Sequence, residues 1–170
     1  MYIRWIGAAL ILAAGGGFGL FLVHDHRKEE WALEELIRVL DLIISEIQFR
    51  MTPLPQLCAM AANQGKGAIK HVFSALEAET LLQTQPDGAA CMNHALERVG
   101  MIPRHTYRNL KMLGQTLGRF DAEGQLRGME AVKTMCIRDL KALQDNRDIR
   151  MRNYQTLGIC AGIALVIVLI

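Results

Sequence analysis

The chain has 170 residues, of which 51% are hydrophobic and 21% charged, and its mean hydropathy of +0.17 exceeds what a water-soluble domain of this length needs. This length excludes a large multidomain enzyme, and a formal net charge of only +2 argues against the strongly basic surface that nucleic-acid binding requires. Only 6% of the residues are aromatic, while Leu, Ala, Met, Glu and Lys are abundant, so the composition favours helices over strands.

The first apolar segment covers residues 5–23 and follows a short tail of residues 1–4. Its 19 residues carry no charge, and as a helix they would extend ~28 Å, close to the thickness of a hydrocarbon core. A secretory signal peptide cleaved near Ala13-Ala14-Gly15 is the alternative. Because the apolar run continues past any such site to Val23, the sequence favours a retained transmembrane helix.

A second apolar segment covers residues 154–170. No charged residue follows Arg152, and the segment would span ~26 Å as a helix, which is a minimal crossing. The alternative is a buried core helix. Residues 163–170 are apolar on every face, however, and a domain this small has no interior large enough to surround them. We therefore predict a second transmembrane helix.

Two crossings would leave residues 24–153 as one domain on one side of the bilayer. Several Lys and Arg residues lie near the ends of that domain, whereas the opposite side has only Arg4. An excess of basic residues marks the cytoplasmic face, so we expect a cytoplasmic domain in a cell-membrane protein. The basic residues nearest the two crossings are Arg27, Lys28, Arg147, Arg150 and Arg152.

Each predicted crossing contains a pair of glycines at helical spacing, Gly15 with Gly19 and Gly158 with Gly162. Small residues let helix backbones approach closely in membrane lipid, where packing replaces the hydrophobic driving force. The alternative is that glycine is simply common in membrane helices. A pair in each crossing favours a packed hairpin or a homo-oligomer.

The polar middle begins with apolar residues at spacings of three and four, which predict a helix from about Arg27 to Arg50. We expect Thr52 to supply a capping hydroxyl, and Pro53 and Pro55 to occupy the first turn of the next helix. The apolar stripe comprises Leu33, Leu36, Ile37, Leu40, Ile43, Ile44 and Ile47.

Four further helices follow, separated by glycine and proline signals. The second helix should end before Gly65, the third near Gln83, and the fourth at Gly100. We expect Thr106 to cap a fifth helix over residues 107–117.

Gly118 should terminate that fifth helix, and Asp121 should cap a sixth. No proline occurs after Pro103, so the sixth helix can run directly into the second crossing. The predicted fold is all-α, an antiparallel bundle of about six helices between N- and C-terminal transmembrane helices.

The sequence offers few residues for catalysis or metal binding. Its four cysteines are scattered singly, and Cys91 with His94 at i,i+3 would supply only half of a metal site. The run Gly15 to Gly19 lacks the Lys and Ser/Thr of a phosphate-binding loop. We therefore expect no cofactor, no metal and no enzymatic activity.

Three groups of residues carry a resemblance to a known family. They are Glu46-Ile47 leading into Thr52-Pro53-Leu54-Pro55, the run from Leu113 to Gly118 followed by Asp121 and Gln125, and Leu157-Gly158 in the C-terminal segment. In this combination, over nearly the whole chain, the sequence resembles the stage III sporulation protein AB family. Gln56 departs from the acidic residue that is frequent in that family at this position.

The resemblance implies a membrane component of the apparatus that links mother cell and forespore during sporulation. The helical domain is similar to the cytoplasmic domains of the F-type inner-membrane platform protein of type II secretion systems. By that analogy its partners would be a cytoplasmic secretion-type ATPase and the channel proteins. The alternatives are a membrane signalling or adaptor module, and an unrecognised membrane enzyme.

Two exposed turns are the candidate contact sites for such partners. Each has a structural alternative, a proline-initiated helix in the first and a glycine turn or close packing in the second. The candidate residues are Thr52, Pro53, Leu54, Pro55, Gln56, Gly114, Thr116, Gly118, Asp121 and Gln125.

Overall fold

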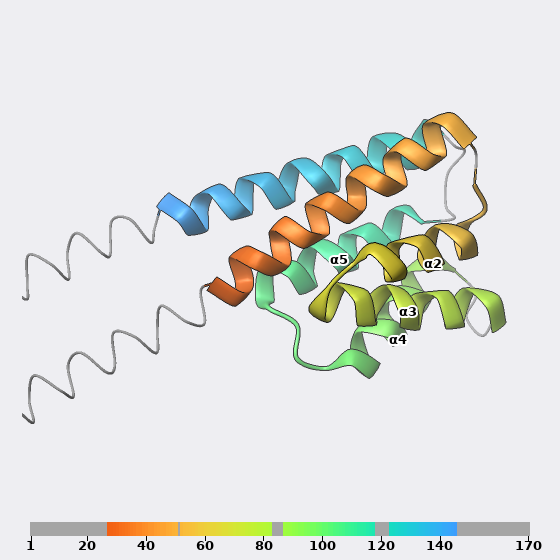
Figure 1. Ribbon diagram of the computed structural model, residues 1–170, viewed down its shortest axis with the longest axis horizontal. Helices are drawn as coiled ribbons and strands as arrows, with labels where there is room; N and C mark the ends of the chain where they lie inside the picture. Colours follow the sequence, from red (N-terminus) through yellow and green to blue (C-terminus); the bar gives the residue numbers. More distant parts are fainter. Residues whose placement is uncertain (1–26, 51, 83–86, 118–122, 146–170) are drawn as a thin grey trace, which may run out of the picture.

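Two long helices and four shorter ones make up the part of the chain that the computed structural model describes, residues 27–50, 52–82, 87–117 and 123–145. The first long helix covers residues 27–50 and the last long helix residues 123–145. They lie side by side and run in opposite directions, so residues 27 and 145 are at the same end of the bundle (Figure 1). An ion pair between Asp41 and Lys133 joins them near their middles.

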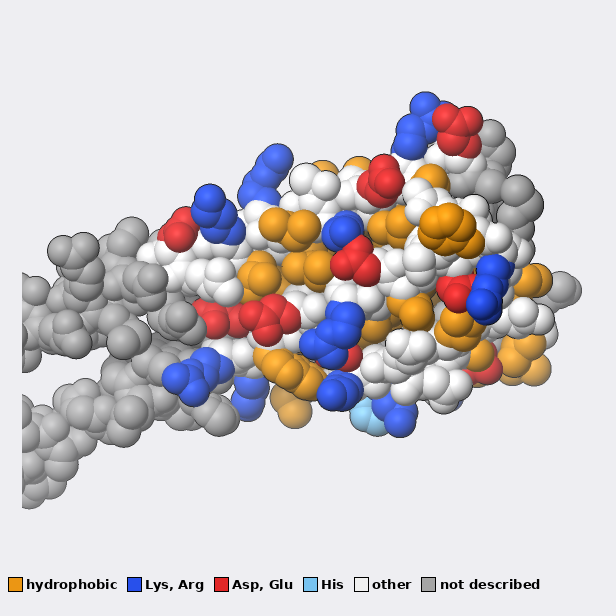
Figure 2. Space-filling view, turned by 45° about the horizontal axis from the view of Figure 1, so that its top comes forward, with side chains coloured by type: hydrophobic (Ala, Val, Ile, Leu, Met, Phe, Trp, Pro, Cys, Tyr) orange, Lys and Arg blue, Asp and Glu red, His pale blue; other side chains and the backbone are white. Residues whose placement is uncertain are grey.

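The shorter helices pack against one another in chain order, beside the two long ones (Figure 1). The described residues thus confirm the predicted all-α bundle of six helices. Charged side chains of both signs alternate with apolar ones over the face shown in Figure 2. The shorter helices are α2 (Leu54–Gln64), α3 (Gly67–Leu82), α4 (Gly88–Val99) and α5 (Arg104–Thr116).

Local chemistry sets several of the helix ends. Asp87 caps α4, its carboxylate accepting a hydrogen bond from the backbone N–H of Ala90 at 2.7 Å. Gly100 ends α4 with a φ of +77°, a left-handed conformation that glycine adopts without steric cost. Gly67 opens α3 with a φ of +55°, and a Cβ there would lie 2.6 Å from the ring of Trp31.

The core lies where the long helices meet the shorter ones, and it uses the predicted apolar stripe. Leu33, Leu36 and Leu40 of the first long helix are completely buried. Burial of such side chains is the main source of the bundle's stability. They pack in one cluster with Ile69, Val72, Phe73 and Leu76 of α3, Met92 and Leu96 of α4, Leu110 and Leu113 of α5, and Met129, Val132 and Cys136 of the last long helix.

Two predicted caps are wrong. Pro53 and Pro103 occupy the N-cap positions of α2 and α5, and neither helix has a side-chain cap because a proline side chain has no hydrogen-bond acceptor. Thr106 therefore falls inside the first turn of α5, fully buried. The hydroxyl of Thr52 instead donates a hydrogen bond to Glu46 Oε2 at 3.2 Å.

The predicted crossings, residues 5–23 and 154–170, lie outside the described residues, as do their four glycines. Within the described ranges, each helix is too short or too polar to traverse a bilayer.

Candidate docking groove

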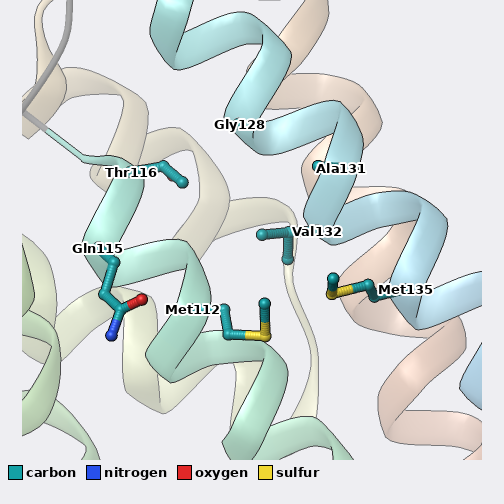
Figure 3. Close-up of a pocket in the computed structure, with 7 residues that line it drawn as sticks. All are labelled: Met112, Gln115, Thr116, Gly128, Ala131, Val132 and Met135. Carbon is teal, nitrogen blue, oxygen red and sulfur yellow. The ribbon is translucent and has the colours of Figure 1, made fainter.

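A groove separates α5 from the last long helix, with a hollow of about 270 Å³. Met112 points into it from α5, and Val132 and Met135 point into it from the last long helix (Figure 3). Gln115 is directed away from the last long helix and borders the groove on the α5 side (Figure 3). Thr116, Gly128 and Ala131 complete the lining.

Close contact between the two helices ends the groove on one side. A Cβ on Gly128 would lie 2.7 Å from the methyl carbon of Thr116 and 2.9 Å from its Cβ. The hydroxyl of Thr116 donates a hydrogen bond to the carbonyl of Leu113 at 2.8 Å, which turns its methyl group toward Gly128. Glycine at position 128 is therefore what allows the helices to touch here.

A polar cluster ends the groove on the other side, one helical turn beyond Met112 and Met135. Arg108 donates two hydrogen bonds to the carboxylate of Asp139, at 2.9 and 2.7 Å. The amide of Asn109, which is fully buried, donates a third to Asp139 Oδ2 at 2.9 Å. Such charge-assisted bonds fix the register of α5 against the last long helix.

The chemistry of the groove suits binding rather than reaction. Its lining is mostly apolar, and Met135 keeps 37% of its surface exposed. Methionine side chains are flexible and polarizable, so two of them can adapt to an apolar side chain from a partner. A hollow of this size between helices accommodates one or two such side chains.

The three thiols among the described residues are buried, and burial raises the pKa of each. Burial raises the pKa of Cys58 to about 12, with a smaller contribution from Glu77. Burial raises the pKa of Cys136, one helical turn after the lining residue Val132, from 9.0 to about 12, with Asp139 adding to the effect. Because the thiolate is the nucleophile and the metal ligand, neither cysteine is prepared for chemistry.

Cys91 and His94, the pair considered for a metal site, have other surroundings in α4. His94 Nδ1 lies 2.8 Å from Glu79 Oε1 of α3, and Arg98 also donates to that oxygen at 3.3 Å. Burial, followed by the charge of Glu79, raises the pKa of Cys91. Among the described residues, no three His, Cys, Asp or Glu side chains gather in a way that could hold a metal ion.

The structure separates the candidate residues of the second turn. Gly114 is buried against α4, where a Cβ would lie 2.5 Å from Met92 Cβ, so it serves close packing. Thr116 lines the groove, and Gln125 is half-buried one turn before Gly128. Gly118 and Asp121 lie outside the described residues.

The candidates of the first turn lie at the start of α2. Pro53 and Gln56 are exposed, whereas Leu54 and Pro55 are half-buried and Leu54 packs against the core. Neither this turn nor Thr52 contributes to the lining of the groove. Whether these residues contact a partner stays a prediction.

Of the seven lining residues, only Thr116 was a candidate contact residue from the sequence. The other six are Met112, Gln115, Val132, Gly128, Ala131 and Met135. The spacing of the last three, at i, i+3 and i+7, was the available signal, because it places small or apolar side chains on one helix face. This face lies beside the side chains of Met129, Val132 and Cys136, which are buried.

Comparison with known proteins gives one family and one fold. The model of the family described as stage III sporulation protein AB matches residues 4–170. No curated protein matches the chain. A solved structure of a stage III sporulation protein AB (SpoIIIAB) shares the fold, with a TM-score of 0.63 and 20% sequence identity over 72% of this chain and 98% of that one.

Proposed function

The chain belongs to the stage III sporulation protein AB family, and from that premise we propose that it is a non-enzymatic platform in a secretion-like channel between mother cell and forespore. In this role it couples a cytoplasmic secretion-type ATPase to channel subunits in the membrane. The predicted crossings, residues 5–23 and 154–170, anchor the platform in the membrane, and the bundle faces the mother-cell cytoplasm.

The groove between α5 and the last long helix is the observation that carries this proposal. Met112 and Met135 line this groove, and contacts between the two helices at Gly128 and at Asp139 close its two ends. Apolar anchors in such clefts supply most of the energy of many protein interfaces. An ATPase subunit that inserts an apolar side chain there would be held directly against the last long helix.

The last long helix is suited to transmit force from that contact. It has 23 residues, about 34 Å of helix, and it runs from the groove toward the end of the bundle where the second predicted crossing follows. The first long helix lies beside it in the opposite direction (Figure 1). The Asp41–Lys133 ion pair and the shared core join these two antiparallel helices, and elements with many buried contacts resist local opening, which favours coupling over signalling by local unfolding.

Capture of the purified sporulation ATPase by the full chain in detergent tests the proposal. Met135→Gln should weaken capture by about tenfold or more, because truncation of a hot-spot side chain costs ~2 kcal/mol or more and each ~1.4 kcal/mol is a factor of ten. Ile137→Gln is the matched control, since Ile137 is on the same helix as Met135, is 46% exposed and does not line the groove. Equal capture by both variants and the parent would refute the groove as the docking site. Recovery only of regulatory proteins from sporulating cells would identify an adaptor instead.

A further inference from the structure

Three segments distant in sequence meet at the end of the bundle where residue 27 lies. Glu29 accepts hydrogen bonds from the backbone N–H of His105 at 2.7 Å and is 2.8 Å from its Nδ1, which brings the start of α5 to this end. The ring of Trp31 lies against Gly67 at the start of α3. The loops before α3 and before α5 therefore both lie at this end of the bundle (Figure 1).

These segments are basic on their exposed surface. Their acidic side chains add little negative charge to this surface, because Glu30 is buried and Glu29 is hydrogen-bonded to His105. The last long helix adds Arg138 and Lys141 as exposed bases and Asp145 as an exposed acid, so the sum stays positive. The exposed bases of the three segments are Arg27, Lys28, Lys66, Lys70 and Arg104.

Apolar side chains stand among these bases. Met101 is 96% exposed, and the space around the neighbouring Gly100 is open to 4 Å. Trp31 is 44% exposed, with its ring edge on the same loop as Lys66. Basic residues beside an aromatic ring and an exposed apolar side chain form a surface suited to the interface of an anionic bilayer.

We infer that this end of the bundle, formed by residues 27–31, 65–70 and 100–105, rests on the membrane and binds anionic lipid headgroups, with Met101 inserted among the acyl chains. This rests on the proposed membrane placement. The distance fits, because residue 27 follows the predicted first crossing by only four residues, about 6 Å of helix. This contact sets the tilt of the bundle on the membrane.

Fluorescence quenching of the full chain in vesicles tests the inference. A fluorophore is attached at Met101→Cys in a Cys160→Ser background, since the thiols of Cys58, Cys91 and Cys136 are buried. Lipids with a quencher on the acyl chain should quench it, and about twofold or more strongly when phosphatidylglycerol is mixed with phosphatidylcholine. Lys66→Gln with Lys70→Gln should remove that difference.

Leu82→Cys is the matched control, because Leu82 is 71% exposed and lies at the opposite end of α3 from Gly67. Its fluorophore should be insensitive to the quenching lipids in either mixture. If the chain floats with vesicles and captures the ATPase, but the probe at position 101 behaves like the one at 82, only the lipid contact is refuted. If the chain does not float with vesicles at all, the membrane placement falls with it.

Discussion

Helix α5 packs against α4 on one side and against the last long helix on another, and the two contacts differ. Against α4 the contact is tight, since Gly114 leaves no room for a Cβ beside the fully buried Met92. Against the last long helix α5 touches at Gly128 and bonds to Asp139, and a hollow of about 270 Å³ remains between these two points. One side of α5 therefore stabilises the fold, and the other is free to receive a partner.

The largest expected effect concerns whether water reaches past the groove to Cys136. At pH 8 a thiol whose pKa is about 12 has roughly a thousandfold less thiolate than one at 9.0, so maleimide should label Cys136 about that much more slowly than a free thiol. Cys58, which has the same raised pKa and does not line this groove, is the internal control. Mass spectrometry of the labelled peptides measures both rates.

The pH dependence has a definite sign. A raised thiol pKa means that the unfolded chain loses the proton first, so stability is complete below pH 9 and declines as pH rises from 9 toward 12. Labelling of both cysteines should accelerate over the same range. If Cys136 is labelled much faster than Cys58 at pH 8, the groove gives water access to the core. The contact of α5 with the last long helix would then be even looser, relative to its contact with α4, than the structure shows.

The second effect tests the tight side of α5 by Gly114→Ala. Alanine in a helix interior gains up to ~1 kcal/mol over glycine. Its Cβ would meet Met92 Cβ at 2.5 Å and Cγ at 2.9 Å in the middle of α4, where the backbone cannot yield. Overpacking costs about 1–3 kcal/mol, so the variant should be about 1–2 kcal/mol less stable. Denaturant unfolding of the full chain in detergent measures this, and unchanged stability would show that α4 and α5 adjust freely.

The sequence predicted those features of the fold that depend on residue spacing within a single helix. The helices and their core stripe were predictable, because burial of Leu33, Leu36 and Leu40 follows from spacing within one helix. The caps at Thr52 and Thr106 were mispredicted because prolines, not threonines, occupy the N-cap positions of α2 and α5. Prolines at 53 and 103 were the stronger signal in both cases.

The groove could not be predicted by the same reasoning. Its volume depends on the distance between α5 and the last long helix, which the pattern of one helix does not contain. Gly114 was left with two interpretations, a turn or close packing, and only the position of Met92 distinguishes them. Met135 can be read in the sequence, but its role as a lining residue depends on Met112, which faces it across the groove (Figure 3).

The smallest expected effect comes from the same substitution on the open side, Gly128→Ala. The new Cβ would lie 2.7 Å from the Thr116 methyl, but Thr116 is the last residue of α5 and borders the hollow, so it can shift by tenths of an ångström. The helix-propensity gain of up to ~1 kcal/mol then offsets the contact, and the net change should stay within about 0.5 kcal/mol. Denaturant unfolding beside Gly114→Ala measures it. An equal loss of unfolding free energy in both variants would mean that α5 is held as rigidly on the groove side as on the α4 side. A rigid groove could not adapt to an inserted side chain.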